Sequence, residues 1–441
     1  MMTRAGQHAF VVGLGTAVVP LDTAVNIAFP AITRGLGLAT QDIQWVVICY
    51  VLTYTALTLA LGRIGDIYGH RAVFRAGLLW STAALSLCAL APNFPALLAC
   101  RFLQGIGTAL VLSCGAALAT TIYGEDRRSR ALGTYTMMFA AGATIGPWLG
   151  GALVEMWDWP AVFWFRVPIA AAALLLSRRL PAPPQGAREP FDLAGAVLLA
   201  AALIAMLLTF NRLGEIAALP LGLASLAAFV GFIRHEGRCD KPIIDPAYFR
   251  LPGFAVANLA SVLTNLAAFA VWLLVPFYLA RAGDLPLAAS GAILATASFG
   301  LVVASPIAGR VIGRIAAARL ALIGALLLGI GLALVATWEA DTPAVWLVVT
   351  LTVQGFGLGL FQLAYTDIVT AALPLRHRGV AGSLAMVTRT IGTVSAAATV
   401  MLLFQRLETA DGFFAAFHRT FALAAVLPFA MAGLLALRRW R

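Results

Sequence analysis

The first long apolar run of the chain, from Ala9 to Pro30, carries a single carboxylate, Asp22. The run has about the length that a helix needs to cross the hydrocarbon core of a bilayer, ~20 residues. An acid at that depth is unfavourable by at least ~2.5 kcal/mol, so it is rarely present without a role. In an unbroken helix Asp22 and Asn26 share one face, which must contact protein or water. We interpret Asp22 as a proton or substrate site, and the alternative is a packing acid neutralised by protonation or by a neighbour.

Apolar runs of this kind recur along the whole chain. Hydrophobic residues make up 61% of the sequence and charged residues 11%, whereas soluble domains carry about 25% charged residues. Hydropathy and turn residues predict an all-α polytopic membrane protein with 14 transmembrane helices, or 12 if the seventh and eighth lie flat in the interface. The predicted spans are 9–30, 43–61, 73–91, 95–122, 131–154, 160–177, 193–213, 217–233, 253–280, 288–308, 319–337, 343–371, 380–404 and 414–437.

The net charge of +11 comes from basic residues in short segments between the apolar runs. In a soluble chain this charge would suggest nucleic acid, but here membrane orientation explains it and we predict no nucleic-acid partner. Most of the 30 Lys and Arg residues lie on the side that holds both ends. The positive-inside rule therefore predicts a multi-pass protein of the cell (inner) membrane with both termini in the cytoplasm. The cysteines and histidines show no metal-ligand spacing, so no metal and no cofactor are predicted.

Short segments recur in the same order at the two ends of the chain. Gln104–Gly107 in the fourth predicted span corresponds to Gln354–Gly357 in the twelfth, and Thr144–Gly146 corresponds to Thr390–Gly392. Many secondary transporters are built from such repeats, with the substrate near the midplane. We therefore predict three parts, which are a six-helix half over 1–177, a linker with a two-helix insert over 178–252, and a six-helix half over 253–441.

Three further motifs accompany the acidic first span. Gly62–Arg71 (GRIGDIYGHR) follows the second predicted span, and Arg101 places a guanidinium inside the fourth. Gly142–Gly151 (GATIGPWLGG) spaces glycines at i, i+4 and i+8, which lets another helix pack closely, and its proline adds a kink. The depths of Asp22 and Arg101 in their spans agree, so we expect these two side chains to approach each other.

Together these segments resemble the signature motifs of the major facilitator superfamily, and in particular the fourteen-spanner drug:proton antiporter family. The resemblance implies two six-helix halves with a two-helix insert, and the exchange of protons for a small lipophilic or cationic compound by alternating access. We also expect a monomer and no enzymatic activity. It assigns proton coupling to Asp22 and Arg101. It also implies a cytoplasmic gate formed by Gly62, Asp66, Gly69 and Arg71. A hinge and helix-packing surface is implied for Gly142, Gly146, Pro147, Gly150 and Gly151.

Other polar and aromatic residues are candidates for the substrate cavity or for a second charged pair. The cavity candidates are Asn26, Gln104, Tyr50, Tyr54, Gln354 and Tyr365, although aromatic residues in a membrane helix also serve packing. In the second half, Asp367 and Arg389 are candidates for a charged pair, which is either functional or structural.

Several alternatives stay open at this point. Arg101 could snorkel to the outer interface, and Arg166, which stands where the family usually has asparagine, is expected to snorkel or to cap its helix locally. The first-span motif is one residue shorter between Asp22 and Asn26 than in typical members. Proton-coupled or facilitated uptake of a metabolite is the second functional hypothesis. A non-transporting sensor or enzyme is the third, and it lacks a convergent set of catalytic residues.

Overall fold

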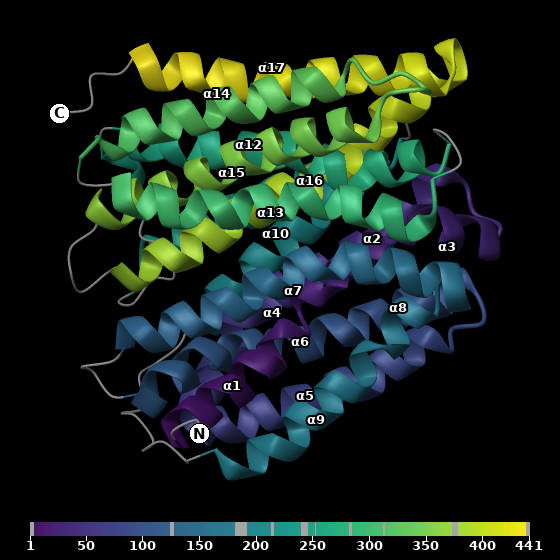
Figure 1. The fold of residues 1–441 in the computed structure, drawn as a ribbon. Coiled ribbons are helices and arrows are strands. Elements are labelled where there is room, and N and C mark those ends of the chain that lie inside the picture. Colours follow the sequence, from purple (N-terminus) through teal and green to yellow (C-terminus); the bar gives the residue numbers. More distant parts are fainter. Residues whose placement is uncertain are drawn as a thin grey trace. The chain divides into compact units, whose positions relative to one another are not determined.

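The structure is a computed structural model that describes residues 4–123, 128–180, 192–212, 216–239, 246–251, 253–281, 285–311, 314–372 and 378–437. The regular elements of these ranges are α-helices and short 3-10 helices (Figure 1). Helices suit the long apolar runs because a backbone in lipid must satisfy its own hydrogen bonds. The elements are α1 (Arg4–Ala17), η1 (Pro20–Thr23), α2 (Ala24–Ile27), α3 (Phe29–Gly35), η2 (Thr40–Ile43), α4 (Gln44–Tyr68), α5 (His70–Ala89), α6 (Phe94–Tyr123), α7 (Arg128–Trp157), α8 (Ala161–Trp164), α9 (Arg166–Leu176), η4 (Ser177–Arg179), α10 (Leu193–Asn211), α11 (Ala218–Glu236), η5 (Pro246–Arg250), α12 (Phe254–Leu279), α13 (Leu287–Val311), α14 (Ala317–Val335), α15 (Ala344–Ala372), α16 (Arg378–Asp411) and α17 (Phe413–Leu437).

The predicted number of 14 transmembrane helices is not supported. In the described residues 11 helices are long and apolar enough to span, or 12 if one bent pair counts as a single span. The bent pair explains part of the difference, because Phe29–Gly35 and Thr40–Thr58 meet at 120°. Within the described residues, α10 contributes the shorter apolar helix Ala194–Met206, so the seventh predicted span is not among these 11. The fifth predicted span corresponds to α7, which is also not among the 11 helices counted over the described residues.

The first predicted span is present as one apolar span, Phe10–Ile27, but the type of helix changes along it. α1 ends at Ala17, and the chain continues as the 3-10 helix η1, which begins at Pro20, and then as α2. Proline has no N–H and its ring crowds the preceding turn, so it interrupts a helix. The amide of Asp22 bonds the carbonyl of Val19 at 3.0 Å, which is the tighter i→i+3 pattern. Asp22 therefore lies on a short segment with its own backbone geometry.

The described chain forms two compact units. Unit 1 comprises Met1–Ala196 and Pro286–Ala295, and unit 2 comprises Val197–Leu285 and Thr296–Arg441. These boundaries follow spatial contacts, whereas the predicted halves and insert follow the sequence repeat. The division into two six-helix halves and an insert therefore stays a prediction.

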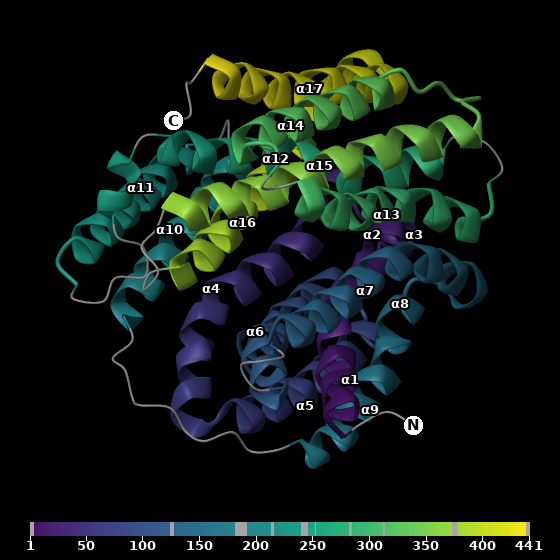
Figure 2. The ribbon, with the colours of Figure 1, turned by 60° about the vertical axis from the view of Figure 1, so that its left-hand side comes forward.

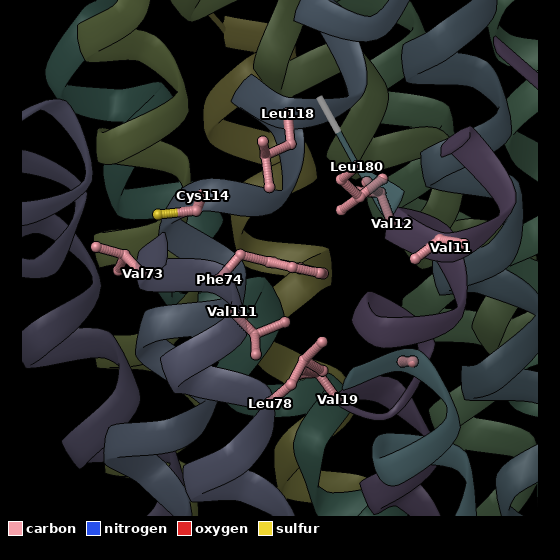
Figure 3. Close-up of a cluster of buried hydrophobic side chains, with 11 residues drawn as sticks. Val11, Val12, Val19, Val73, Phe74, Leu78, Val111, Cys114, Leu118 and Leu180 are labelled. Carbon is pink, nitrogen blue, oxygen red and sulfur yellow. The ribbon is translucent and has the colours of Figure 1, made fainter. Parts of the chain in front are cut away.

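The core of unit 1 joins α1, α5, α6 and α9 on one side of the acidic segment. Figure 3 shows Phe74 of α5 among aliphatic side chains that include Val111 and Leu118 of α6. A Cβ on Gly15 of α1 would lie 2.8 Å from the ring of Phe74, so α1 and α5 approach closely here. This dry contact fixes α1 before its chain turns into the segment that carries Asp22.

Unit 2 is built around α14, which packs against α15 and α17 (Figure 1). Phe417 of α17 stacks on Tyr278 at 5.0 Å and on Trp338 at 6.0 Å between ring centroids. Offset aromatic pairs of this kind add stability beyond the area that they bury. The cluster links the ends of α12, α14 and α17.

Helices α10 and α11 form the pair predicted as an insert, and Figure 2 shows them adjacent to each other. The hydroxyl of Ser225 donates to the carbonyl of Ala202 at 2.9 Å, which joins the two helices. Large apolar side chains of α11, including Leu219 and Leu226, are exposed. Such a surface suits a helix that faces lipid.

Candidate functional site

The carboxylate of Asp22 accepts two hydrogen bonds from the guanidinium of Arg101 on α6. Nη1 lies 2.7 Å from Oδ1 and Nη2 lies 2.9 Å from Oδ2. This bidentate geometry is the strongest form of an arginine–carboxylate pair. The predicted approach of Asp22 to Arg101 is confirmed.

The surroundings of Arg101 exclude the snorkelling alternative. Its side chain is 1% exposed, and its Nε donates to the carbonyl of Val46 on α4 at 2.8 Å. The guanidinium carbon lies 4.2 Å from the ring centre of Tyr50, a cation–π contact. Arg101 thus ties α6 to α4 as well as to the first span.

Arg166 is the third charged member of the cluster, and its expected snorkelling is wrong. Its Nη1 lies 2.6 Å from Oδ1 of Asp22 and its side chain is 0% exposed. The local bond that was the other expectation is present, since Nε donates to the carbonyl of Val162 at 3.1 Å. Arg166 lies within the continuous span Ala161–Arg179, and its side chain is directed to Asp22. The arginine in place of the family's asparagine was the available signal in the sequence.

Gln104 completes the cluster and was predicted only as a cavity residue. Its Nε2 donates to Oδ1 of Asp22 at 3.0 Å, and its Oε1 accepts from Nη1 of Arg101 at 2.8 Å. Two further cavity candidates lie beside it on α4, where the Tyr54 ring meets the Tyr50 ring edge-on at 5.1 Å. Asn26 is half-buried on α2, and none of the hydrogen bonds described joins it to the cluster.

The glycines of α7 pack directly on the segment that carries Asp22. A Cβ on Gly150 would lie 2.8 Å from the carbonyl oxygen of Ala24, and one on Gly142 would lie 3.0 Å from that of Ala17. A Cβ on Gly146 would overlap the hydroxyl of Thr23. That hydroxyl is also 3.3 Å from the carbonyl of Ala143 on α7. Only residues without a side chain allow this approach, so the glycine stripe positions the acidic segment.

Two other residues of the glycine motif face the start of α13, which belongs to unit 1. A Cβ on Gly151 would overlap the carbonyl of Leu287, and one on Gly291 would overlap the carbonyl of Pro147. The close packing predicted for this motif is confirmed, and its role as a hinge stays a prediction.

The predicted cytoplasmic gate is described in part. Nη2 of Arg71 donates to the carbonyl of Arg178 at 2.7 Å, at the end of the sixth predicted span. Gly69 has φ +90°, which favours glycine, and it separates α4 from α5. Gly62 and Asp66 lie within α4, and the side chain of Asp66 is outside the described part of the structure. The gate itself stays a prediction.

The remaining candidates lie in unit 2. Tyr365 is buried and its hydroxyl donates to Oδ1 of Asn258 at 2.9 Å, whereas Gln354 is buried where Gly331 of α14 packs on α15. The ion pairs of the described residues do not include one between Asp367 and Arg389, and Arg389 is exposed.

Comparison with known proteins assigns the family. A sequence model described as the Major Facilitator Superfamily matches residues 9–235 and 257–441. The chain belongs to the Major Facilitator Superfamily. The resemblance inferred from the motifs is thereby confirmed, and the chain is a multi-pass membrane transporter.

Several superfamily members with assigned names are similar to this chain. The riboflavin transporter RibZ of Clostridioides difficile (strain 630) is 28% identical over 376 residues, which cover 85% of this chain and 82% of the relative. The tetracenomycin C resistance and export protein of Streptomyces glaucescens is 28% identical, with 86% of this chain and 72% of the relative covered. The puromycin resistance protein pur8 of Streptomyces alboniger is 31% identical, with coverage of 88% and 81%.

Solved structures of two transporters share the fold. A POT family transporter in complex with 5-aminolevulinic acid matches with a TM-score of 0.74 at 14% identity, and covers 98% of this chain and 96% of that chain. The nucleoside transporter NupG matches with a TM-score of 0.73 at 14% identity, with coverage of 99% and 98%. These likenesses support the fold of this superfamily member.

Proposed function

We propose that this superfamily member is a monomeric antiporter that exports a small organic compound from the cytoplasm in exchange for protons. The observation that carries the proposal is the ion pair of Asp22 with two buried arginines, Arg101 and Arg166. Intramembrane acids that pair with arginine are typical of proton and substrate pathways. In this proposal both termini lie in the cytoplasm, as the distribution of basic residues predicts.

The chemistry of Asp22 supplies two states. An ionised carboxylate accepts hydrogen bonds from both arginines and from Gln104. A protonated carboxyl carries no charge and loses most of that attraction. Proton binding therefore releases the segment that carries Asp22 from α6 and α9.

The packing of this segment connects the two states to helix movement. The segment touches Gly146 and Gly150 of α7, so a displacement of Asp22 presses on or withdraws from α7. Close glycine contacts transmit small shifts because they leave no space to absorb them. We propose that this contact links proton occupancy to the alternation of access.

Relatives support export and leave one alternative. The names of the tetracenomycin C and puromycin relatives refer to resistance, and the first also refers to export. The riboflavin transporter favours the second candidate function, which is movement of a small metabolite, including uptake. The direction of proton-driven movement separates the two candidates.

The test is transport in reconstituted vesicles with an imposed pH gradient. We expect accumulation of at least one compound from a panel of cationic dyes and metabolites, driven in exchange for protons. Asp22→Asn removes the charge without changing the size of the side chain, and it should reduce gradient-driven transport to the level of empty vesicles. Asp411→Asn is the matched control, because Asp411 pairs with Arg419 on an exposed surface of unit 2.

Two results would contradict the proposal. Full gradient-driven transport by Asp22→Asn would remove Asp22 from proton coupling. Movement of every transported compound in the same direction as protons would replace export by symport.

A further inference from the structure

The charged cluster of unit 1 contains one more cation than anion. Asp22 is the carboxylate that pairs with both Arg101 and Arg166 in the described residues, and no other described ion pair involves either arginine. With Asp22 ionised, the cluster has a formal charge of +1. A buried charge without a full counter-charge is unfavourable unless something else neutralises it.

The two arginines use their donors differently. Each of the three guanidinium nitrogens of Arg101, Nε, Nη1 and Nη2, donates to a protein oxygen. Arg166 uses Nε and Nη1, whereas its Nη2 is buried and has no hydrogen-bond partner in the described structure. Most buried polar groups of proteins are hydrogen-bonded, so an exception of this kind requires an explanation. The free donor of Arg166 therefore lies in a cluster with an excess of positive charge.

The surroundings of the cluster suit an organic anion. The Asp22 side chain is 13% exposed, so the cluster is not sealed on the side of the carboxylate. The ring of Phe163 lies 5.4 Å from the guanidinium carbon of Arg166, and the Tyr50 ring lies 4.2 Å from that of Arg101. Aromatic rings beside a charged donor are typical of sites that bind a molecule with an apolar body and a few polar groups.

We propose that Arg166 binds an anionic oxygen group, such as a carboxylate, of the compound that this protein transports. The inference rests on the proposed function in that it assumes a transported organic compound. It restricts that compound to one with a negatively charged group, whereas the motifs alone suggested a lipophilic or cationic one. Binding of the anion neutralises the cluster and supplies the acceptor that Nη2 lacks.

The first test measures binding without transport. Purified full-length protein is melted in detergent with increasing benzoate or with benzamide, its neutral analogue, at constant ionic strength. We expect saturable stabilisation by benzoate alone. Arg166→Asn, which installs the residue that the family usually has, should weaken the benzoate response about tenfold or more, because a hydrogen bond to a charged group is lost.

Matched variants separate a binding role from a structural one. Arg281→Asn should leave the benzoate response unchanged, because Arg281 likewise has a carboxylate partner, Glu408, and an aromatic neighbour, Phe413, but lies outside the cluster. Arg166→Lys keeps the charge and should retain part of the response. Asp22→Asn raises the formal charge of the cluster to +2 and should strengthen the response. If Arg166→Asn does not fold, these last two variants decide the question.

Inorganic ions and transport complete the test. Stabilisation by chloride or sulfate equal to that by benzoate would overturn the proposal in favour of an inorganic anion site. Equal benzoate and benzamide responses, or a benzoate response that survives Arg166→Asn, would also overturn it. Failure of proton-driven transport with the benzoate response intact would instead reject the proposed function, so the two failures are distinguishable.

Discussion

Gly150→Ala is the sharpest test of how the acidic segment is positioned. The new Cβ would lie 2.8 Å from both the Cβ and the carbonyl oxygen of Ala24. A tolerable contact needs roughly 3.4 Å, so the segment must move by roughly 0.6 Å. Backbone atoms cannot rotate away, so the whole segment has to shift. Asp22 is two residues from Ala24 on this segment.

The energetic effect follows from that displacement. Overpacking of this size destabilises a core by about 1–3 kcal/mol, against a gain of up to ~1 kcal/mol from the higher helix propensity of alanine. A shift of the same size stretches the 2.6 Å contact between Arg166 and Asp22 beyond the range of a charge-assisted bond. We therefore expect a lower melting temperature and a large loss of proton-driven transport in protein that still folds.

Melting in detergent and transport in vesicles measure the two effects separately. Gly433→Ala is the control, since a Cβ at this helical position of α17 would meet no atom within 4 Å. It should melt at or slightly above the wild-type temperature. If Gly150→Ala melts and transports as Gly433→Ala does, the glycine stripe does not position Asp22.

Three other substitutions test the site and unit 2. Arg101→Lys keeps the charge but loses the bidentate contact with Asp22. It should lower the free energy of unfolding, measured in a melting assay, by about 1.5–3 kcal/mol. An unchanged melting temperature would contradict the bidentate pair. Tyr365→Phe removes the hydroxyl that bonds Asn258 and should lower the free energy of unfolding by about 1–2 kcal/mol in the same assay. An unchanged stability would show that the hydroxyl is bonded only to solvent. Phe417→Ala deletes a fully buried ring and should destabilise unit 2 by about 3–5 kcal/mol. Unfolding is followed by tryptophan fluorescence. A loss of stability under about 1 kcal/mol would show that the aromatic cluster is not cooperative.

The sequence was sufficient to predict the helical membrane fold, the family and the pairing of Asp22 with Arg101. Each of these depends on long apolar runs, ordered motifs or depth along a helix, which a sequence contains directly. The predicted number of spans was wrong because the prediction counted every long apolar run as a span. The bend of 120° between Phe29–Gly35 and Thr40–Thr58 is a tertiary feature that apolar length does not show.

The position of Arg166 could not be predicted by the same reasoning. Arg166 lies near the start of its apolar run, where a long side chain can either snorkel or turn inward, and its partner Asp22 lies 144 positions earlier in the chain. The sequence did indicate that this position differs from the family, since an arginine replaces the usual asparagine. An estimate from helix periodicity alone cannot show that two arginines on different helices converge on one carboxylate.

The change of helix type in the first span also bears on how its motif can vary. In a continuous helix each residue turns the following side chains by about 100°, so the loss of one residue between Asp22 and Asn26 would rotate every later side chain away from its former neighbours. Here the 3-10 helix η1 passes into the α-helix α2 at Ala24. A 3-10 helix turns by about 120° per residue, so a change of helix type compensates part of the rotation that the loss of one residue causes.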